Sequence, residues 1–112
     1  MDCVVTLEGE HGIEGSDALQ FRLRYVPDKL IFDAESFTPY LESLTSPDAW
    51  ISLEASAAHI LDDVNNEIVP RWIQVTLTRT PDADLSSSHS VMLEDRQPKW
   101  DNSALLGRVG AF

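Results

Sequence analysis

Apolar and polar side chains alternate over residues 19–25, and this is the clearest pattern in the chain. The order there is Leu19-Gln20-Phe21-Arg22-Leu23-Arg24-Tyr25. A period of two residues is typical of a β-strand with one buried and one solvated face. The same alternation over 72–78, and the β-branched and apolar residues of 3–7 and 90–94, predict three more strands.

The segments next to this strand predict turns. Val26-Pro27-Asp28 favours a tight turn, since proline fixes φ and aspartate tolerates turn conformations. Residues 29–32 then read as a short strand that pairs back on 19–25 as an antiparallel hairpin. A loop is expected from Gly9 to Ser16, where three glycines permit unusual backbone angles.

Two helices are predicted in the middle of the chain. The first would span 36–44, with Ser36 as its N-cap and Pro39 in its first turn. The second would begin after Ser52 and end before Pro70. Its apolar residues recur at helical spacing: Leu53, Ala57, Ile60, Leu61, Val64 and Ile68.

This element order predicts an α+β domain, with an antiparallel sheet and both helices on one face. Residues 1–95 are expected to form a single domain. Residues 96–112 are weakly patterned and read as a C-terminal tail or as an arm onto a neighbour. An open sheet has two unpaired edges, which predicts a homo-oligomer.

Charge and composition exclude several kinds of partner. The 112 residues carry 19 acids and 8 bases, a net charge of −11. This argues against binding nucleic acid or an anionic membrane surface, both of which need clustered Lys and Arg. Cys3 is the single cysteine and is expected to pack as a small apolar residue. A reducing, cytoplasmic location fits one unpaired thiol.

Three short motifs resemble one enzyme family. Tyr25-Val26-Pro27-Asp28, Tyr40-Leu41 and Pro70-Arg71-Trp72-Ile73 are similar to the nitrile reductases that convert 7-cyano-7-deazaguanine to its aminomethyl form in queuosine biosynthesis. The resemblance covers roughly residues 10–81. It implies the tunnelling fold, a ββααββ unit whose copies assemble into an oligomeric barrel. It also implies a deazaguanine-, purine- or pterin-like ligand at a subunit interface.

The resemblance assigns catalytic positions to two acids. Asp17 falls on the family's catalytic aspartate, and Glu10 stands seven residues earlier, where the family has a cysteine. In the family a thiolate adds to the nitrile, and a carboxylate is a poor substitute for it. We therefore do not expect reductase chemistry. A different reaction, with Glu10 and Asp17 as an acid–base pair, stays open.

The family's NADPH segment corresponds to residues 33–38. Asp33 and Ser36 match its cofactor-binding pattern, but Glu35 and Thr38 replace two lysines. The later turn over 80–85 also lacks the family's arginine and two glycines. An acid in place of a lysine repels a phosphate, so we do not expect NADPH to bind.

Glu54 matches the family's substrate-binding glutamate, which opens the second helix. A carboxylate there can accept two parallel N–H bonds from a guanine-like edge. Alternatively, Glu54 is a surface acid that the helix dipole favours. No metal site is expected. The residues that could together hold a zinc ion are His11, Glu10 and His89.

Two functions follow from these residues. The first is a member of the reductase family that binds a heterocycle through Glu54, with Asp17 nearby. The second is a non-catalytic homo-oligomeric binding or scaffold protein. The sequence leaves open whether the chain is an enzyme.

Overall fold

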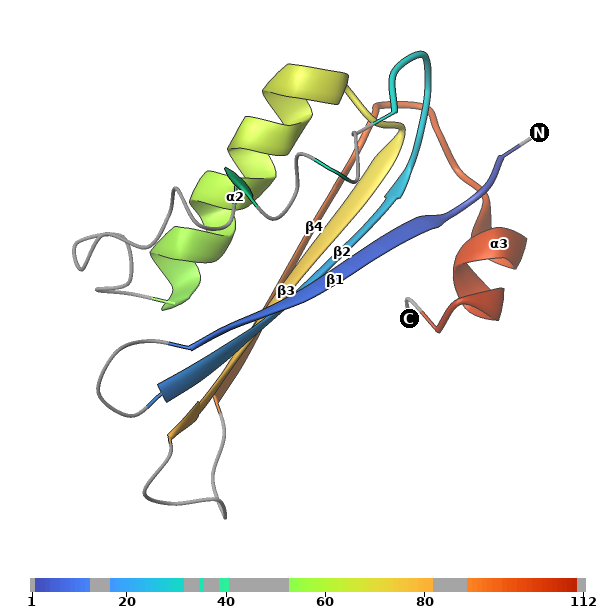
Figure 1. Cartoon of the computed structure of the whole chain (residues 1–112). Coiled ribbons are helices and arrows are strands. Elements are labelled where there is room, and N and C mark those ends of the chain that lie inside the picture. The colour runs from blue at the N-terminus through green and yellow to red at the C-terminus, as the bar shows by residue number, and fades with distance from the viewer. Residues whose placement is uncertain are drawn as a thin grey trace.

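The computed structural model describes residues 2–12, 17–31, 35, 39–40, 53–81 and 89–110. Its elements follow in the order β1 (Val5–Gly12), β2 (Asp17–Val26), α2 (Leu53–Ile68), β3 (Trp72–Pro81), β4 (His89–Arg96) and α3 (Ser103–Arg108). The strands form one antiparallel sheet in the order β1-β2-β3-β4, and α2 crosses one face of it (Figure 1). The predicted α+β class is confirmed. In the described ranges, no helix is long and apolar enough to cross a membrane.

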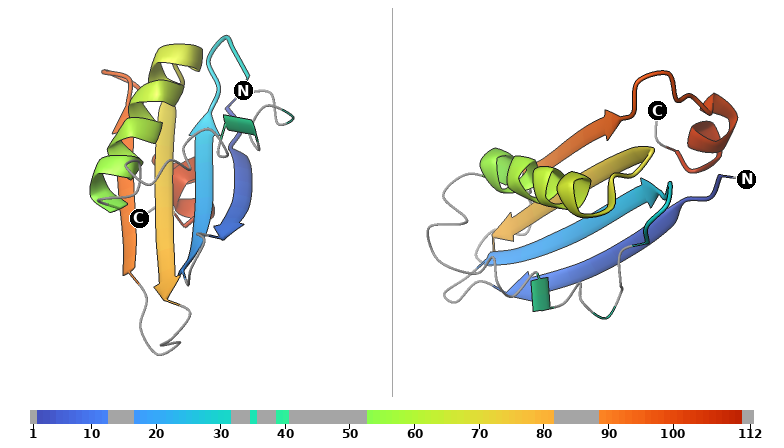
Figure 2. Two further views of the ribbon diagram at one scale, coloured as in Figure 1. Left: turned by 60° about the vertical axis from the view of Figure 1, so that its left-hand side comes forward. Right: turned by 90° about the horizontal axis from the view of Figure 1, so that it is seen from above.

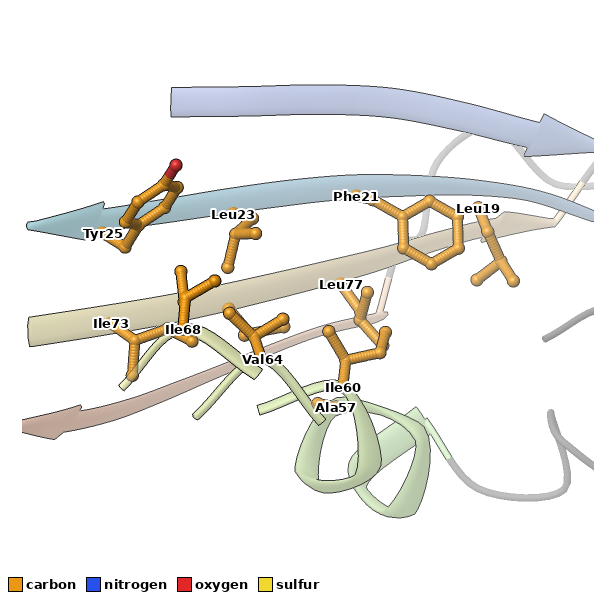
Figure 3. Packing of buried hydrophobic residues seen from close by; sticks show 11 residues of the cluster. Leu19, Phe21, Leu23, Tyr25, Ala57, Ile60, Val64, Ile68, Ile73 and Leu77 are labelled. Atoms are coloured by element: carbon orange, nitrogen blue, oxygen red, sulfur yellow. The ribbon is translucent and has the colours of Figure 1, made fainter. Parts of the chain in front are cut away.

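The main core lies between α2 and the sheet. Side chains alternate across a strand, so every second residue of β2 and β3 faces the helix (Figure 3). The strands contribute Leu19, Phe21, Leu23, Tyr25, Ile73, Val75 and Leu77, and the helix contributes Ala57, Ile60, Val64 and Ile68. The helix predicted after Ser52 is confirmed as α2, and Ala57, Ile60, Leu61, Val64 and Ile68 of the predicted apolar stripe pack in or against the core.

A second, smaller core forms on the opposite face of the sheet. There α3 buries Leu106 against Val26 and Trp72, and Figure 2 shows α3 on the side of the sheet away from α2. The helix begins after Asn102, whose side-chain Oδ1 accepts a hydrogen bond from the Leu105 backbone N–H at 3.1 Å. The pattern of residues 96–112 did not predict this helix. Their proposed role as an arm onto a neighbour stays a prediction.

Three expectations about local structure are wrong. Residues 29–31 do not form a strand, because both edges of β2 are already occupied by β1 and β3. The loop predicted from Gly9 is instead strand as far as Gly12, since β1 itself forms the hairpin with β2. Cys3 is exposed and precedes β1. The helix predicted over 36–44 lies largely outside the described residues.

The motif residues Asp28 and Arg71 act together as a clamp at one end of the sheet. Arg71 contacts Asp2 (Nη1–Oδ1, 2.7 Å) and Asp28 (Nη2–Oδ1, 3.3 Å). Asn102 Nδ2 donates to the other oxygen of Asp2 at 3.2 Å, and Gln97 Nε2 donates to Asp28 at 3.2 Å. The clamp therefore joins the N-terminus, the turn after β2, the start of β3 and the segment before α3.

This clamp predicts a loss of stability in acid. Hydrogen bonds from Asn102 to Asp2 and from Gln97 to Asp28, each with help from Arg71, lower the pKa of both carboxyl groups. A folded-state pKa below the unfolded value stabilises the protein above about pH 4, and this stability is lost as pH falls through the folded-state pKa. We expect the double variant Asp2→Asn with Asp28→Asn to be less stable at neutral pH and to lose less stability on acidification.

The measurement is the free energy of unfolding by urea across that pH range. The control is Asp62→Asn, which changes an exposed acid on α2. An unchanged pH slope in the double variant would rule out a stabilising role for the clamp.

Candidate functional site

The sheet face that α2 does not cover, called the open face below, is polar over most of its length. Strand register places Glu10 opposite Gln20, and Gln20 opposite Thr78. The next row along the sheet has Glu8 opposite Arg22. These are the polar positions of the alternating pattern, so the solvated face predicted for residues 19–25 is confirmed at Gln20 and Arg22.

A cavity of about 540 Å³ lies on the open face. Its lining comes from the three strands β1, β2 and β3: Glu8, Gly9, Glu10, Gln20, Phe21, Arg22, Thr76 and Thr78. Arg22 is the one cation among the described residues that line the cavity, and its Nε lies 3.3 Å from Oε1 of Glu8. The carboxylate of Glu10 is exposed, and within the described part of the chain it has no hydrogen-bond or ion-pair partner.

Glu54 lies on the other side of the sheet, in the first turn of α2. Its side chain is 62% exposed, and its Oε1 lies 3.2 Å from Nε2 of His89 at the start of β4. The helix dipole favours an acid at this position. Glu54 therefore presents an accessible carboxylate at the end of α2 where β4 begins, as expected from its place in the helix.

The remaining predicted site residues are only partly described. Asp17 begins β2, three residues before Gln20, the cross-strand partner of Glu10. Its side chain lies outside the described part, as do Asp33 and Ser36 entirely. The zinc combination is not assembled within one chain, because Glu10 is on β1 and His89 is on β4, at opposite edges of the sheet. Among the described residues, no three metal-ligating side chains gather.

A buried polar group that the sequence did not single out lies under α3. Arg24 is 5% exposed and donates from Nε to Oε1 of Gln74 at 2.8 Å and from Nη1 to the carbonyl of Val109 at 2.5 Å. Its guanidinium also lies over the Trp72 ring, 5.9 Å from the centroid. Burial lowers the pKa of this guanidinium. Alternation placed Arg24 and Gln74 on the solvated face, but both are buried at the end of that face where α3 and Val109 lie.

Comparisons with known proteins give a consistent result. The sequence profile of one family, described as QueF-like protein, matches residues 17–86. Two curated relatives, the NADPH-dependent 7-cyano-7-deazaguanine reductases of two strains of Acidithiobacillus ferrooxidans, are each 28% identical over 107 residues, which is 96% of this chain and 70% of theirs. Among solved structures, the archaeosine synthase QueF-Like in its apo form matches with a TM-score of 0.65 at 18% identity, over 84% of this chain and 92% of that chain. At that identity the likeness supports the fold alone.

Proposed function

The chain belongs to the QueF-like protein family, and we propose that it binds a deazaguanine-, purine- or pterin-like heterocycle through Glu54 at a subunit interface. The observation that carries the proposal is the accessible Glu54 carboxylate in the first turn of α2. Such a carboxylate can accept the two parallel N–H groups at the edge of a guanine-like base. His89, which now contacts Glu54, would be displaced or would become a second contact to the ligand.

A site between subunits is supported by the two faces of the sheet. Glu10 lines the cavity on the open face, whereas Glu54 lies on the α2 side. Within one subunit the sheet therefore lies between the two carboxylates. A ligand that touches both needs Glu54 from one copy and Glu10 from another.

The proposal does not include NADPH-dependent reduction. Glu10 stands at the position of the family's nucleophilic cysteine and cannot form the same covalent intermediate. The described residues also do not fit a phosphate-bearing cofactor. In the described lining of the cavity, Arg22 is the one cation, and it is paired with Glu8. Glu35, which lies in sequence between the expected cofactor residues Asp33 and Ser36, is an exposed acid.

A second candidate is a non-catalytic homo-oligomeric tunnelling-fold scaffold or binding protein. It is favoured by the position of Glu54, because this residue is not among those that line the open-face cavity and so does not contribute to that cavity within one subunit. Titration calorimetry with 7-cyano-7-deazaguanine, guanine and a pterin separates the two candidates. We expect saturable binding of at least one of them, and binding of none would favour the scaffold.

Both candidates predict a stable assembly of several copies. The edge strands β1 and β4 are eight residues long, and among the described residues each pairs with another strand on one side only. Such edges are commonly closed by pairing with another copy. Light scattering at micromolar concentration should therefore give a mass several times 12.5 kDa, the mass of one chain. A single species of one chain's mass would contradict the assembled tunnelling fold.

A further inference from the structure

The open-face cavity has an unbalanced charge. Of its three charged side chains, Glu8 and Arg22 neutralise each other across a 3.3 Å contact. The third, Glu10, is without a partner in the described part of the chain. The cavity is therefore a polar hollow with one free negative charge. Its volume of about 540 Å³ falls in the range of small-molecule sites.

The groups around Glu10 add hydrogen-bond acceptors rather than cations. Gln20 lies directly opposite Glu10 and offers an amide oxygen, and Thr78 is the next residue in that row. The Thr78 hydroxyl is 2.9 Å from that of Ser90, so one of the two donates to the other, and each oxygen can still accept a hydrogen bond. A carboxylate, an amide oxygen and hydroxyl oxygens together suit a group that carries several N–H donors and a positive charge.

A protonated primary amine suits the Glu10 carboxylate, and a nitrile does not. An ammonium group offers three N–H donors and a charge opposite to that of Glu10. A nitrile nitrogen is only an acceptor, so it would meet the carboxylate lone pairs without a hydrogen between them. The net charge of −11 on the chain adds a general attraction for cationic ligands.

We propose that the Glu10 cavity takes the protonated amine of the ligand, so that the chain binds the aminomethyl form of a 7-deazaguanine in preference to the nitrile form. The inference rests on the proposed function, since Glu54 of a neighbouring copy would hold the heterocycle while Glu10 holds its side group. It makes Glu10 a specificity-determining residue. The chain would then recognise an amine of the kind that a nitrile reduction yields.

The test is titration calorimetry at low ionic strength with 7-aminomethyl-7-deazaguanine and with 7-cyano-7-deazaguanine. We expect the wild type to bind the aminomethyl compound about tenfold more tightly, which is the low end for a charge-assisted hydrogen bond at an accessible site. Glu10→Gln should remove this preference by weakening only the aminomethyl compound. Added salt should weaken the aminomethyl compound more than the nitrile in the wild type, which tests the charge without any substitution.

The matched control is Glu67→Gln, which removes the same charge from an exposed position on α2. Glu67 is not among the residues that line the cavity, so the preference should persist. Equal affinity of the wild type for the two compounds would overturn the inference and leave the proposed heterocycle binding intact. An equal loss of preference in the control would overturn it as well. If neither compound binds, the proposed function fails, and the inference fails with it.

Discussion

Replacing Glu54 with glutamine is expected to weaken the binding of a guanine-like ligand about 30- to 150-fold. Glutamine keeps the length and shape of the side chain but turns one of its two acceptors into an N–H donor. A ligand edge with two parallel N–H groups then loses one hydrogen bond and faces a donor across the other position. The ligand itself desolvates this pair, which is why the expected effect exceeds that of an exposed ion pair.

The matched control for this variant is Glu67→Gln on the same helix. Glu67 is exposed near the end of α2 and is far from the first turn. Its replacement removes the same charge from the same element, and ligand affinity should stay within about twofold. If the ligand stabilises the wild type and Glu54→Gln equally in a thermal-shift assay, Glu54 is a surface acid that the helix dipole favours, and the heterocycle lies elsewhere.

Replacing Leu77 with alanine is expected to destabilise the subunit by about 3 kcal/mol. Leu77 is fully buried on β3, opposite Phe21 on β2, and Figure 3 shows it beside Ile60 of α2. Alanine would leave a cavity in the layer that fixes α2 on the sheet. Because α2 carries Glu54, the same substitution should also loosen the candidate binding site.

Urea unfolding of the variant measures this effect. Leu30→Ala is the control, because it makes the same chemical change at a side chain that is 53% exposed in the turn after β2. We expect that control to stay within about 0.5 kcal/mol of the wild type. Two variants of equal stability would mean that the contact between α2 and the sheet contributes little to the fold.

The long, strongly patterned elements could be predicted from the sequence. The alternation of apolar and polar residues over 19–25 and the helical spacing of apolar residues over 53–68 each indicate which side of the element is buried. Both elements are present in the structure, as β2 and α2. The segment over 29–32 was misassigned because a short apolar run does not say whether a strand edge is available to it. That edge of β2 is taken by β1, whose residues 5–8 pair with 22–25 and whose residues 9–12 suggested a loop because of their glycines.

Pattern could not predict which parts of the chain cover the open face. α3 is six residues long and buries only Leu106 among its own residues, so its apolar signal is too short to separate from a tail. The burial of Arg24 depends on that helix and was missed for the same reason. The sequence could name Glu10 and Glu54 as site candidates only by their positions along the chain. Their separation onto two faces of the sheet depends on strand register and on the packing of α2.

The measurement that tests the central claim most directly follows NADPH consumption while the protein is saturated with 7-cyano-7-deazaguanine, at concentrations fixed by the calorimetric titration. The account predicts that a heterocycle binds but that NADPH is not oxidised above the rate without protein. The reasons are that Glu10 replaces the nucleophile and that Arg22, the cation in the described lining of the cavity, is already paired with Glu8. NADPH oxidation that rises in proportion to protein concentration and depends on the nitrile would contradict it.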